Sequence, residues 1–337
     1  MSDMIDILAA TAGRTFSGGE SGAWARIVAA GLHRVLLPED QGGAGDAFEE
    51  AAAVATQIGA KALAAPLDET IVANWCLAKA GLPIDDRPCA VISAALVDAR
   101  LTEAGTVMWS KPFFLRDDVS RAVVALASPR GPVLGVLDGL PAGEQSVSMA
   151  GDRGRMVPAS TQGFRLTTVA PFPEAAPDPL VLLALLKASA IAGALDAVLG
   201  LSIEYANTRK QFGRTIGQFQ AVQHMTAKIS GEVVAAAACV QHAARALAGP
   251  HGAWSVAVAK GFTSEAAGTV AALAHQIHGA IGFTEDFVLQ RYTKRLWTWR
   301  EDAGSEIYWF ERLGGAALGA GESGLWPAIV EGLPLTE

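Results

Sequence analysis

Two stretches in the C-terminal half of the chain carry residue types that suit a phosphate or diphosphate group. In the first, at 205–223, Arg209 and Arg214 flank a glycine, and Gln220 then opens the next helix. Arginine side chains and the free N–H groups at a helix start both favour bound phosphate. A solvated loop between two helices has the same composition, so this stretch alone does not define a site.

The second stretch runs from Gln276 to Gly282, at the end of a predicted helix. Gly279 and Gly282 would let the main chain come close to a ligand, because glycine has no side chain. An ordinary helix end also uses glycine, and a lone His278 is more often a structural hydrogen-bonding residue than a base. The two stretches are therefore more informative together than apart.

A turn rich in carboxylates follows a basic, aromatic helix near the end of the chain. It contains Glu301, Asp302 and Glu306. A carboxylate held in a dry pocket can act as a general base. The same acids could instead be solvated or pair with Arg295 and Arg300, which is the simpler interpretation of the composition.

The elements that must position these residues change character along the chain. Residues 1–84 show helical spacing of apolar residues, residues 85–172 alternate short apolar runs with turns, and residues 173–325 return to helix. The predicted fold class is α+β, mainly α, with an N-terminal helical domain, a small β-domain and a C-terminal four-helix bundle. The bundle helices are predicted at 180–207, 219–248, 255–277 and 285–299.

Composition excludes several classes of function. A net charge of −8 argues against general binding of nucleic acid. The three cysteines are widely spaced, which predicts reduced thiols in a cytoplasmic protein and no metal site. The N-terminus lacks the pattern of a secretion signal. The most apolar stretch, 179–201, is interrupted by Lys187 and Asp196, which predicts a buried bundle helix and no membrane span.

Taken together, the motifs resemble those of the acyl-CoA dehydrogenase family. These are FAD enzymes that oxidise the Cα–Cβ bond of an acyl-CoA thioester. The resemblance covers most of the chain and is strongest from about residue 180 to 310. The matching segments are RKQFG at 209–213, FQAVQH at 219–224 and QIHGAIGFTED at 276–286, with PEDQGG at 38–43 and PLDET at 66–70 in the N-terminal part.

The resemblance implies which residues bind FAD. Family members contact the FAD diphosphate and adenosine half, across a subunit boundary, through one arginine-containing segment, one glutamine and one glycine-rich segment. An oligomer is therefore implied. The corresponding residues in this sequence are Arg209, Gln211, Phe212, Gln220, Gln276, Gly279, Ala280 and Gly282.

The family's catalytic base has no counterpart at either of its usual positions. Counting along the motif places Ala303 at the usual glutamate and Leu183 at the alternative position on the long helix. Glu301 and Asp302 are the acids nearest to the expected site. The flavin-contacting stretches of the family's β-domain are also missing from 85–172, where Trp109 is expected to be a core residue rather than a remnant of that site.

One arrangement within the family accounts for these departures. Some bacterial acyl-CoA dehydrogenases of steroid degradation are α2β2 heterotetramers, in which a shorter chain lacks the base and completes the FAD site. The sequence resembles that shorter chain, so a second acyl-CoA dehydrogenase-like subunit, an acyl-CoA substrate, possible roles in lipid metabolism and electron-transferring flavoprotein as acceptor are implied. The open alternatives are a self-sufficient homomeric enzyme that uses Glu301 or Asp302 and a non-catalytic binding or scaffold protein.

The long apolar helix leaves one further question about the acyl group. It carries small residues, namely Ala184, Ala188, Ser189 and Gly193. They could leave room for a wide acyl group such as a steroid, or they could permit close packing between helices, which is the simpler interpretation.

Overall fold

The computed structural model describes residues 2–333 and 335. By its internal contacts the chain divides into two compact units, which are described separately here. Unit 1 comprises residues 1–17, 52–63 and 184–337, and unit 2 comprises residues 18–51 and 64–183. The division at 84/85 and 172/173 that the sequence predicts stays a proposal for the domain boundaries.

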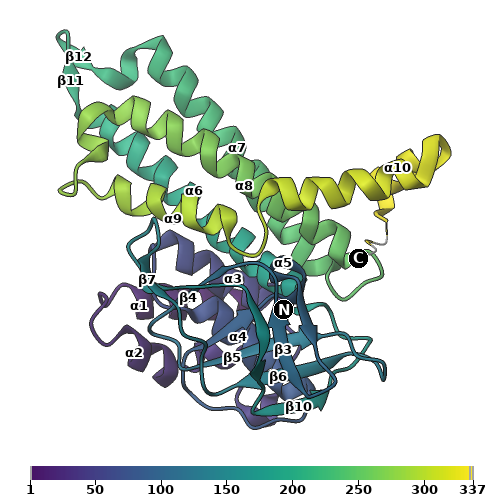
Figure 1. The fold of residues 1–337 in the computed structure, drawn as a ribbon. Helices are drawn as coiled ribbons and strands as arrows, with labels where there is room; N and C mark the ends of the chain where they lie inside the picture. The colour runs from purple at the N-terminus through teal and green to yellow at the C-terminus, as the bar shows by residue number, and fades with distance from the viewer. Residues whose placement is uncertain (1, 334, 336–337) are drawn as a thin grey trace. The chain divides into compact units, whose positions relative to one another are not determined.

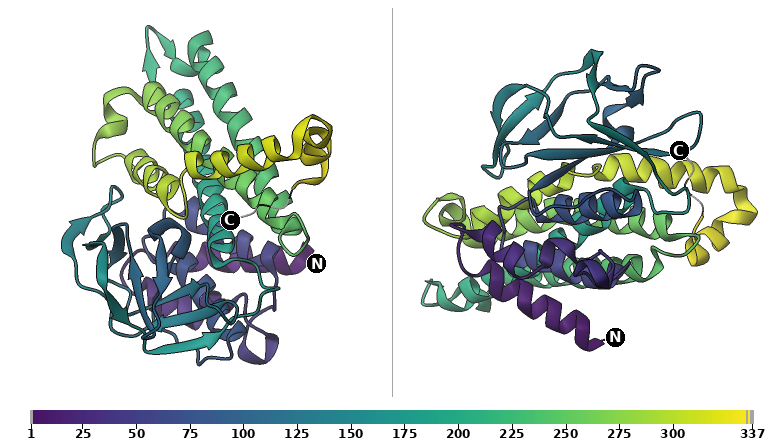
Figure 2. Two further views of the ribbon diagram at one scale, coloured as in Figure 1. Left: turned by 45° about the vertical axis from the view of Figure 1, so that its right-hand side comes forward. Right: turned by 90° about the horizontal axis from the view of Figure 1, so that it is seen from below.

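Unit 1 is helical, and its helices α6, α7, α8 and α9 lie side by side as a bundle, from which α10 projects (Figures 1 and 2). The predicted bundle helices all form, each with ends within a few residues of those expected. A further long helix, α10, follows the carboxylate-rich turn, in the part of the predicted helical segment for which no separate helix was named. The helices are α1 (Ser2–Phe16), α3 (Phe48–Ala60), α6 (Pro179–Thr208), α7 (Gln220–Ala246), α8 (Gly252–His278), α9 (Leu289–Glu301) and α10 (Glu306–Glu331).

Helices α3 and α6 touch through their main chains. A Cβ atom at Gly59 would overlap the carbonyl oxygen of Ala190, and one at Gly193 would overlap that of Thr56. The neighbouring small residue Ser189 is fully buried and donates its hydroxyl to the carbonyl of Leu185 at 2.8 Å. Helix packing therefore accounts for the small residues at this part of α6.

The length and hydropathy of α6 would allow it to cross a membrane. However, 78% of its most apolar window is buried inside the protein. That is the pattern of a core helix, as the charged residues within the segment predicted.

Unit 2 combines short helices with small sheets. Its helical elements are α2 (Ala23–Ala29), η1 (Leu32–Arg34), η2 (Glu39–Gln41), α4 (Leu67–Lys79) and α5 (Ala94–Val97). Polar side chains fix α4 and the loops: Trp75 Nε1 donates to Asp46 at 2.8 Å, and buried His33 lies 2.8 Å from Asp86. Helix α5 begins after Ser93, which caps it by accepting a hydrogen bond from the Leu96 amide.

The strands of unit 2 form three small sheets. The largest has the order β1-β5-β6-β10, with β1 parallel to β5 and the other pairs antiparallel; the others have the orders β2-β3-β9 and β4-β8-β7. The strands are β1 (Cys89–Ile92), β2 (Ala99–Leu101), β3 (Thr106–Trp109), β4 (Phe113–Arg116), β5 (Arg121–Leu126), β6 (Val133–Leu137), β7 (Glu144–Val147), β8 (Arg153–Val157), β9 (Ser160–Arg165) and β10 (Thr168–Pro171).

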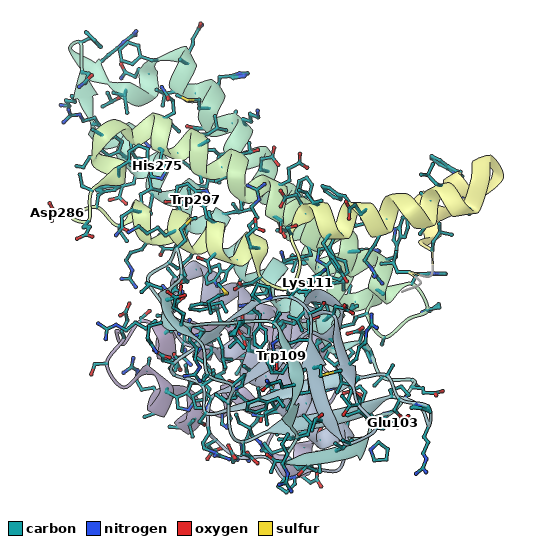
Figure 3. All side chains as sticks on the ribbon, viewed as in Figure 1. Glu103, Trp109, Lys111, His275, Asp286 and Trp297 are labelled. Atoms are coloured by element: carbon teal, nitrogen blue, oxygen red, sulfur yellow. The ribbon has the colours of Figure 1, made fainter. Side chains whose placement is uncertain are left out.

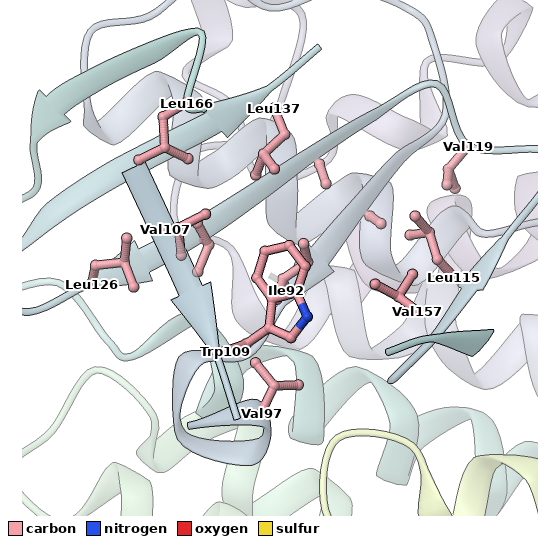
Figure 4. Close-up of a cluster of buried hydrophobic side chains, with 13 residues drawn as sticks. Ile92, Val97, Val107, Trp109, Leu115, Val119, Leu126, Leu137, Val157 and Leu166 are labelled. Atoms are coloured by element: carbon pink, nitrogen blue, oxygen red, sulfur yellow. The ribbon is translucent and has the colours of Figure 1, made fainter. Parts of the chain in front are cut away.

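Trp109 is a core residue of unit 2, as expected. It is 3% exposed and lies within a cluster of buried apolar side chains from several strands (Figure 4). Its ring packs edge-on against Phe113, with centroids 5.4 Å apart, and its Nε1 donates to the carbonyl of Pro158 at 2.8 Å. Because both its ring and its N–H are engaged, its burial and partners are those of a structural residue.

Candidate functional site

A two-stranded hairpin carries the arginine-containing motif between α6 and α7. Strand β11 (Lys210–Gln211) pairs antiparallel with β12 (Arg214–Thr215). The two residues at the tip, Phe212 and Gly213, have φ angles of 53° and 80°. Two consecutive left-handed residues define the tight hairpin turn for which glycine is favoured. The turn presents the Phe212 side chain to solvent, 90% exposed.

The hairpin is braced against the start of α7. The guanidinium of Arg214 lies 4.1 Å from the ring centroid of Phe219, and the rings of Phe212 and Phe219 meet edge to face at 6.1 Å. The amide of Ile216 also donates to the carbonyl of Arg209 at 2.9 Å. Arg209 is itself exposed, so its charged group is available to a ligand or to another chain.

A shallow groove of about 890 Å³ lies between the start of α7 and the end of α8. It brings together Gln220 and Gln276, two of the residues that the sequence predicted for the cofactor. The α7 N-cap, Phe219, makes no side-chain hydrogen bond to the first-turn amides, and such a helix start favours an anion. Residues that were not predicted also line the groove, namely Ala221, Gln223, His224, Met225 and Ala227.

The glycines of the second motif have different roles. Helix α8 ends at Gly279, whose φ of 63° lies in the left-handed region and whose surroundings are open. The 3-10 helix η4 (Gly279–Phe283) follows, with Ala280 exposed. Gly282 is buried, and a Cβ there would lie 3.1 Å from the Leu289 side chain and 3.2 Å from His275 Nδ1. Gly279 is thus open to a ligand, whereas packing accounts for Gly282.

Two buried histidines support this turn from behind. His275 stacks on Phe283, with centroids 4.0 Å apart, and its Nε2 lies 3.0 Å from Thr293 Oγ1. It also stacks more distantly on Trp297, and both residues are labelled in Figure 3. His278 stacks on Tyr205 at 4.6 Å. Burial is the main cause that lowers the pKa of both imidazoles. The burial and ring contacts of His278 are those of a structural residue, which is the role that the sequence favoured over that of a base.

In the turn between α9 and α10 an alanine stands at the usual base position, and the neighbouring acids are ion-paired or exposed. Ala303, at the usual base position, is buried with a φ of 57°, and its carbonyl accepts a hydrogen bond from Trp309 Nε1 at 3.0 Å. Asp302 forms an ion pair with Lys187 at 3.1 Å. Glu301 is 68% exposed and lies 3.9 Å from Arg300. Leu183, at the alternative position, is 5% exposed and apolar.

Lys260 holds the same turn from inside the bundle. It is fully buried, and its Nζ donates to Ser264 Oγ at 2.8 Å, to the carbonyl of Arg300 at 3.0 Å and to that of Gly304 at 2.7 Å. Burial lowers its pKa to about 7, which Asp302 partly opposes. An ammonium beside the last carbonyls of α9 also suits the negative end of the helix dipole. In the sequence, Lys260 is marked only as a lysine in an apolar helix.

The residues present fit the diphosphate and adenosine half of FAD. The hairpin supplies an exposed arginine, the groove supplies amide side chains and a helix start, and Gly279 leaves the main chain open. None of the described residues that line the groove is acidic, so the groove does not repel a diphosphate. Among the residues that the structure describes, no group of His, Cys, Asp and Glu has a metal-binding arrangement.

Comparison with known proteins defines the class. The family described as "Acyl-CoA dehydrogenase, C-terminal domain" matches residues 180–306, which contain both cofactor motifs. Acyl-CoA dehydrogenase IpdE2 of Mycolicibacterium smegmatis is 30% identical over 274 residues, which cover 79% of this chain and 78% of that protein. The chain therefore belongs to the acyl-CoA dehydrogenase family, and the predicted enzyme class and its cofactor, FAD, are confirmed.

Solved structures confirm the fold. A variant of the Tcur3481-Tcur3483 steroid ACAD has a TM-score of 0.79 at 23% identity and covers 95% of this chain and 99% of that chain. The ChsE4-ChsE5 complex from Mycobacterium tuberculosis has a TM-score of 0.77 at 20% identity, covering 94% and 96%. At these identities the likeness establishes the α+β, mainly α, fold that the sequence predicted.

Proposed function

We propose that the chain is the base-lacking subunit of a heteromeric FAD-dependent acyl-CoA dehydrogenase. The proposal rests on two features of unit 1, a groove lined by two residues predicted to bind the cofactor and an alanine at the usual position of the base. Gln220 and Gln276 face one groove, whereas Ala303 is apolar and Asp302 is tied to Lys187. A chain that could bind cofactor but lacks a base needs another chain to abstract the α-proton.

Exposed apolar side chains next to the groove support a shared site. Phe212 at the hairpin tip is 90% exposed, and Ile281 and Phe283 in η4 are 42% and 66% exposed. Apolar side chains that gather at one end of a bundle are often covered by a partner. This surface suits a second acyl-CoA dehydrogenase-like subunit, by analogy with the pairs Tcur3481-Tcur3483 and ChsE4-ChsE5.

The cofactor residues of the hairpin and the groove have different roles in the proposed site. Arg209 pairs with the FAD diphosphate, because a guanidinium binds two phosphate oxygens at once. Gln211 and Phe212 extend the hairpin toward the partner, while the amides of Gln220 and Gln276 position the cofactor along the groove. Bound FAD supplies the acceptor for the hydride that leaves Cβ of the acyl-CoA. The partner supplies the carboxylate that removes the α-proton.

The proposed function extends to the substrate and to the assembly of the enzyme. A steroid ACAD and the ChsE4-ChsE5 complex share the fold, so a bulky acyl-CoA substrate, a cytoplasmic α2β2 heterotetramer and electron-transferring flavoprotein as acceptor are proposed for this chain as well. The close contact of Gly193 with α3 favours helix packing over extra room for the substrate at that point of α6.

The test is to purify the chain alone and together with the product of a neighbouring acyl-CoA dehydrogenase gene. We expect turnover of acyl-CoA, followed with an artificial electron acceptor, only in the copurified assembly. Arg209→Gln should lower its FAD content, and Arg130→Gln, an exposed arginine in unit 2, is the matched control. Full dehydrogenase activity of the chain alone would refute the heteromeric assignment. An assembly without flavin absorbance would instead favour the scaffold alternative.

A further inference from the structure

His224 lines the groove but was not among the residues predicted to bind the cofactor. His224 follows Gln220 by four residues on α7, which places both side chains on one face of the helix. Gln276 lines the same groove from α8. His224 is exposed, so a molecule in the groove could reach its imidazole.

The charges around His224 favour an anionic ligand. Lys228 lies one turn further along α7, and Arg214 lies at the hairpin, stacked on Phe219. From α8, the groove wall is the neutral Gln276, with the buried His275 and His278 on either side of it in sequence. The start of α7 adds the positive end of its dipole. A ligand in this groove therefore meets cationic or neutral groups on each element that faces it.

We propose that His224 contacts the diphosphate of FAD in this groove and makes cofactor binding depend on pH near neutrality. This inference rests on the proposed function and adds a residue to it. An imidazole that loses its proton can still donate one hydrogen bond, but only the protonated form adds a positive charge. A single charge-assisted contact is therefore gained on acidification.

The sign of the effect follows from linkage. Contact with an anion favours the protonated form of a histidine, so the FAD diphosphate is held more tightly by the protonated His224. Proton binding and FAD binding then reinforce each other, and the FAD dissociation constant falls as the pH falls from 8 to 6. His275 and His278 act in the opposite direction at lower pH, because their pKa values are lowered and their protonation disrupts the buried stack below η4. Variants must therefore be compared between pH 6 and 8.

The experiment uses the full-length chain in the assembly in which it is purified, after its flavin is removed. FAD, and separately ADP as a probe with a diphosphate but no flavin, are titrated by calorimetry at pH 6, 7 and 8. The variants are His224→Gln, which stays neutral, and His224→Lys, which stays charged. His242→Gln is the matched control, since His242 is an exposed histidine on the same helix about 27 Å further along.

We expect the native protein to bind both probes about tenfold more tightly at pH 6 than at pH 8, the gain typical of one charge-assisted hydrogen bond. His224→Gln should bind weakly across the range, and His224→Lys should bind tightly across it. His242→Gln should follow the native curve. Circular dichroism of each apo-variant checks that the bundle remains folded.

Three outcomes would overturn the inference. If His224→Gln keeps the native affinity and pH dependence for FAD, His224 does not contact the cofactor, although the proposed function stands. If FAD responds to the variants but ADP does not, the contact is not to the diphosphate. If the native assembly binds no FAD at any pH, both the inference and the FAD part of the proposed function fail.

Discussion

The Lys187 ammonium lies 3.1 Å from a carboxylate oxygen of Asp302 and so ties α6 to the turn between α9 and α10. Lys187 is almost fully buried, whereas the Asp302 side chain is 39% exposed. The pair explains why the acid nearest to the expected base position is not free to act as one. The pair also leads to different predictions for Asp302 and Glu301.

Asp302→Asn should reduce stability and leave turnover of the assembled enzyme unchanged. The substitution removes the carboxylate that faces the buried Lys187 ammonium, at a cost of roughly 1–2 kcal/mol once solvent exposure of Asp302 is allowed for. Urea unfolding and steady-state turnover measure the two effects. Glu301→Gln is the control, and because Glu301 is exposed, neither quantity should change.

The result that contradicts this prediction is equally definite. If Asp302→Asn abolishes turnover while the assembly keeps its FAD, then Asp302 is the catalytic base and the chain is a self-sufficient enzyme. If Glu301→Gln does so, the same conclusion applies to Glu301.

The pH dependence of stability should report the buried Lys260. Its pKa is lowered to about 7 in the folded protein and is about 10.4 in an unfolded chain. Between these values the unfolded state binds more protons, so the free energy of unfolding rises with pH, by at most about 1.4 kcal/mol per pH unit. Denaturant unfolding between pH 7 and pH 10 measures this slope, which Lys260→Met should lack.

Lys260→Met should also be less stable than the native protein at pH 10. It leaves the carbonyl oxygens of Arg300 and Gly304 without their buried donor, at a cost of roughly 2 kcal/mol. Ser264→Ala is the control, because it removes one acceptor of the ammonium but keeps the titrating group. A native slope in Lys260→Met would show that another residue causes the pH dependence.

Acidification should destabilise the protein through His275. Burial, followed by the nearby His278, lowers its pKa in the folded state. Below about pH 6.5 the imidazole is protonated more readily in the unfolded chain than in the folded chain. The free energy of unfolding therefore decreases as the pH is lowered. His275→Phe keeps the ring stack on Phe283 but cannot titrate, so its unfolding free energy should fall less between pH 7.5 and pH 5.

A matched variant separates titration from hydrogen bonding. Thr293→Val removes the hydroxyl that lies 3.0 Å from His275 Nε2, which costs about 1 kcal/mol, but it keeps the imidazole. It should therefore retain the native loss of stability on acidification. Equal pH dependence in His275→Phe and the native protein would rule out His275 as the group responsible.

Periodicity and turn chemistry predicted most of the fold. Long apolar segments gave the helices α6 to α9 to within a few residues, because such segments have few alternatives to a bundle. The β-segment as a whole was predicted, but short strands such as β7 were not predicted individually. Strand β7 is largely exposed, with the burial pattern of an edge, so it lacks the alternating apolar residues that mark a half-buried strand.

The candidate site was predicted residue by residue only where a motif existed. Arg209, Gln220 and Gln276 were named from the sequence, and the last two indeed line one groove. Lys260 was not named, because its role depends on the carbonyls of Arg300 and Gly304, 40 and 44 residues away. Contacts of this kind arise from how α8 and α9 pack and leave no pattern in the local sequence.

The contact between α3 and α6 leads to a final prediction. Gly193→Ala should destabilise unit 1 strongly, because its Cβ would overlap the carbonyl oxygen of Thr56, which is main chain and cannot rotate away. Separating two packed helices to admit a methyl group costs about 1–3 kcal/mol or more. Gly200→Ala on the same helix meets no atom within 4 Å and should instead stabilise the helix by about 0.5–1 kcal/mol. Thermal unfolding of both variants measures the difference, and a Gly193→Ala protein as stable as Gly200→Ala would show that the two helices do not meet through this glycine.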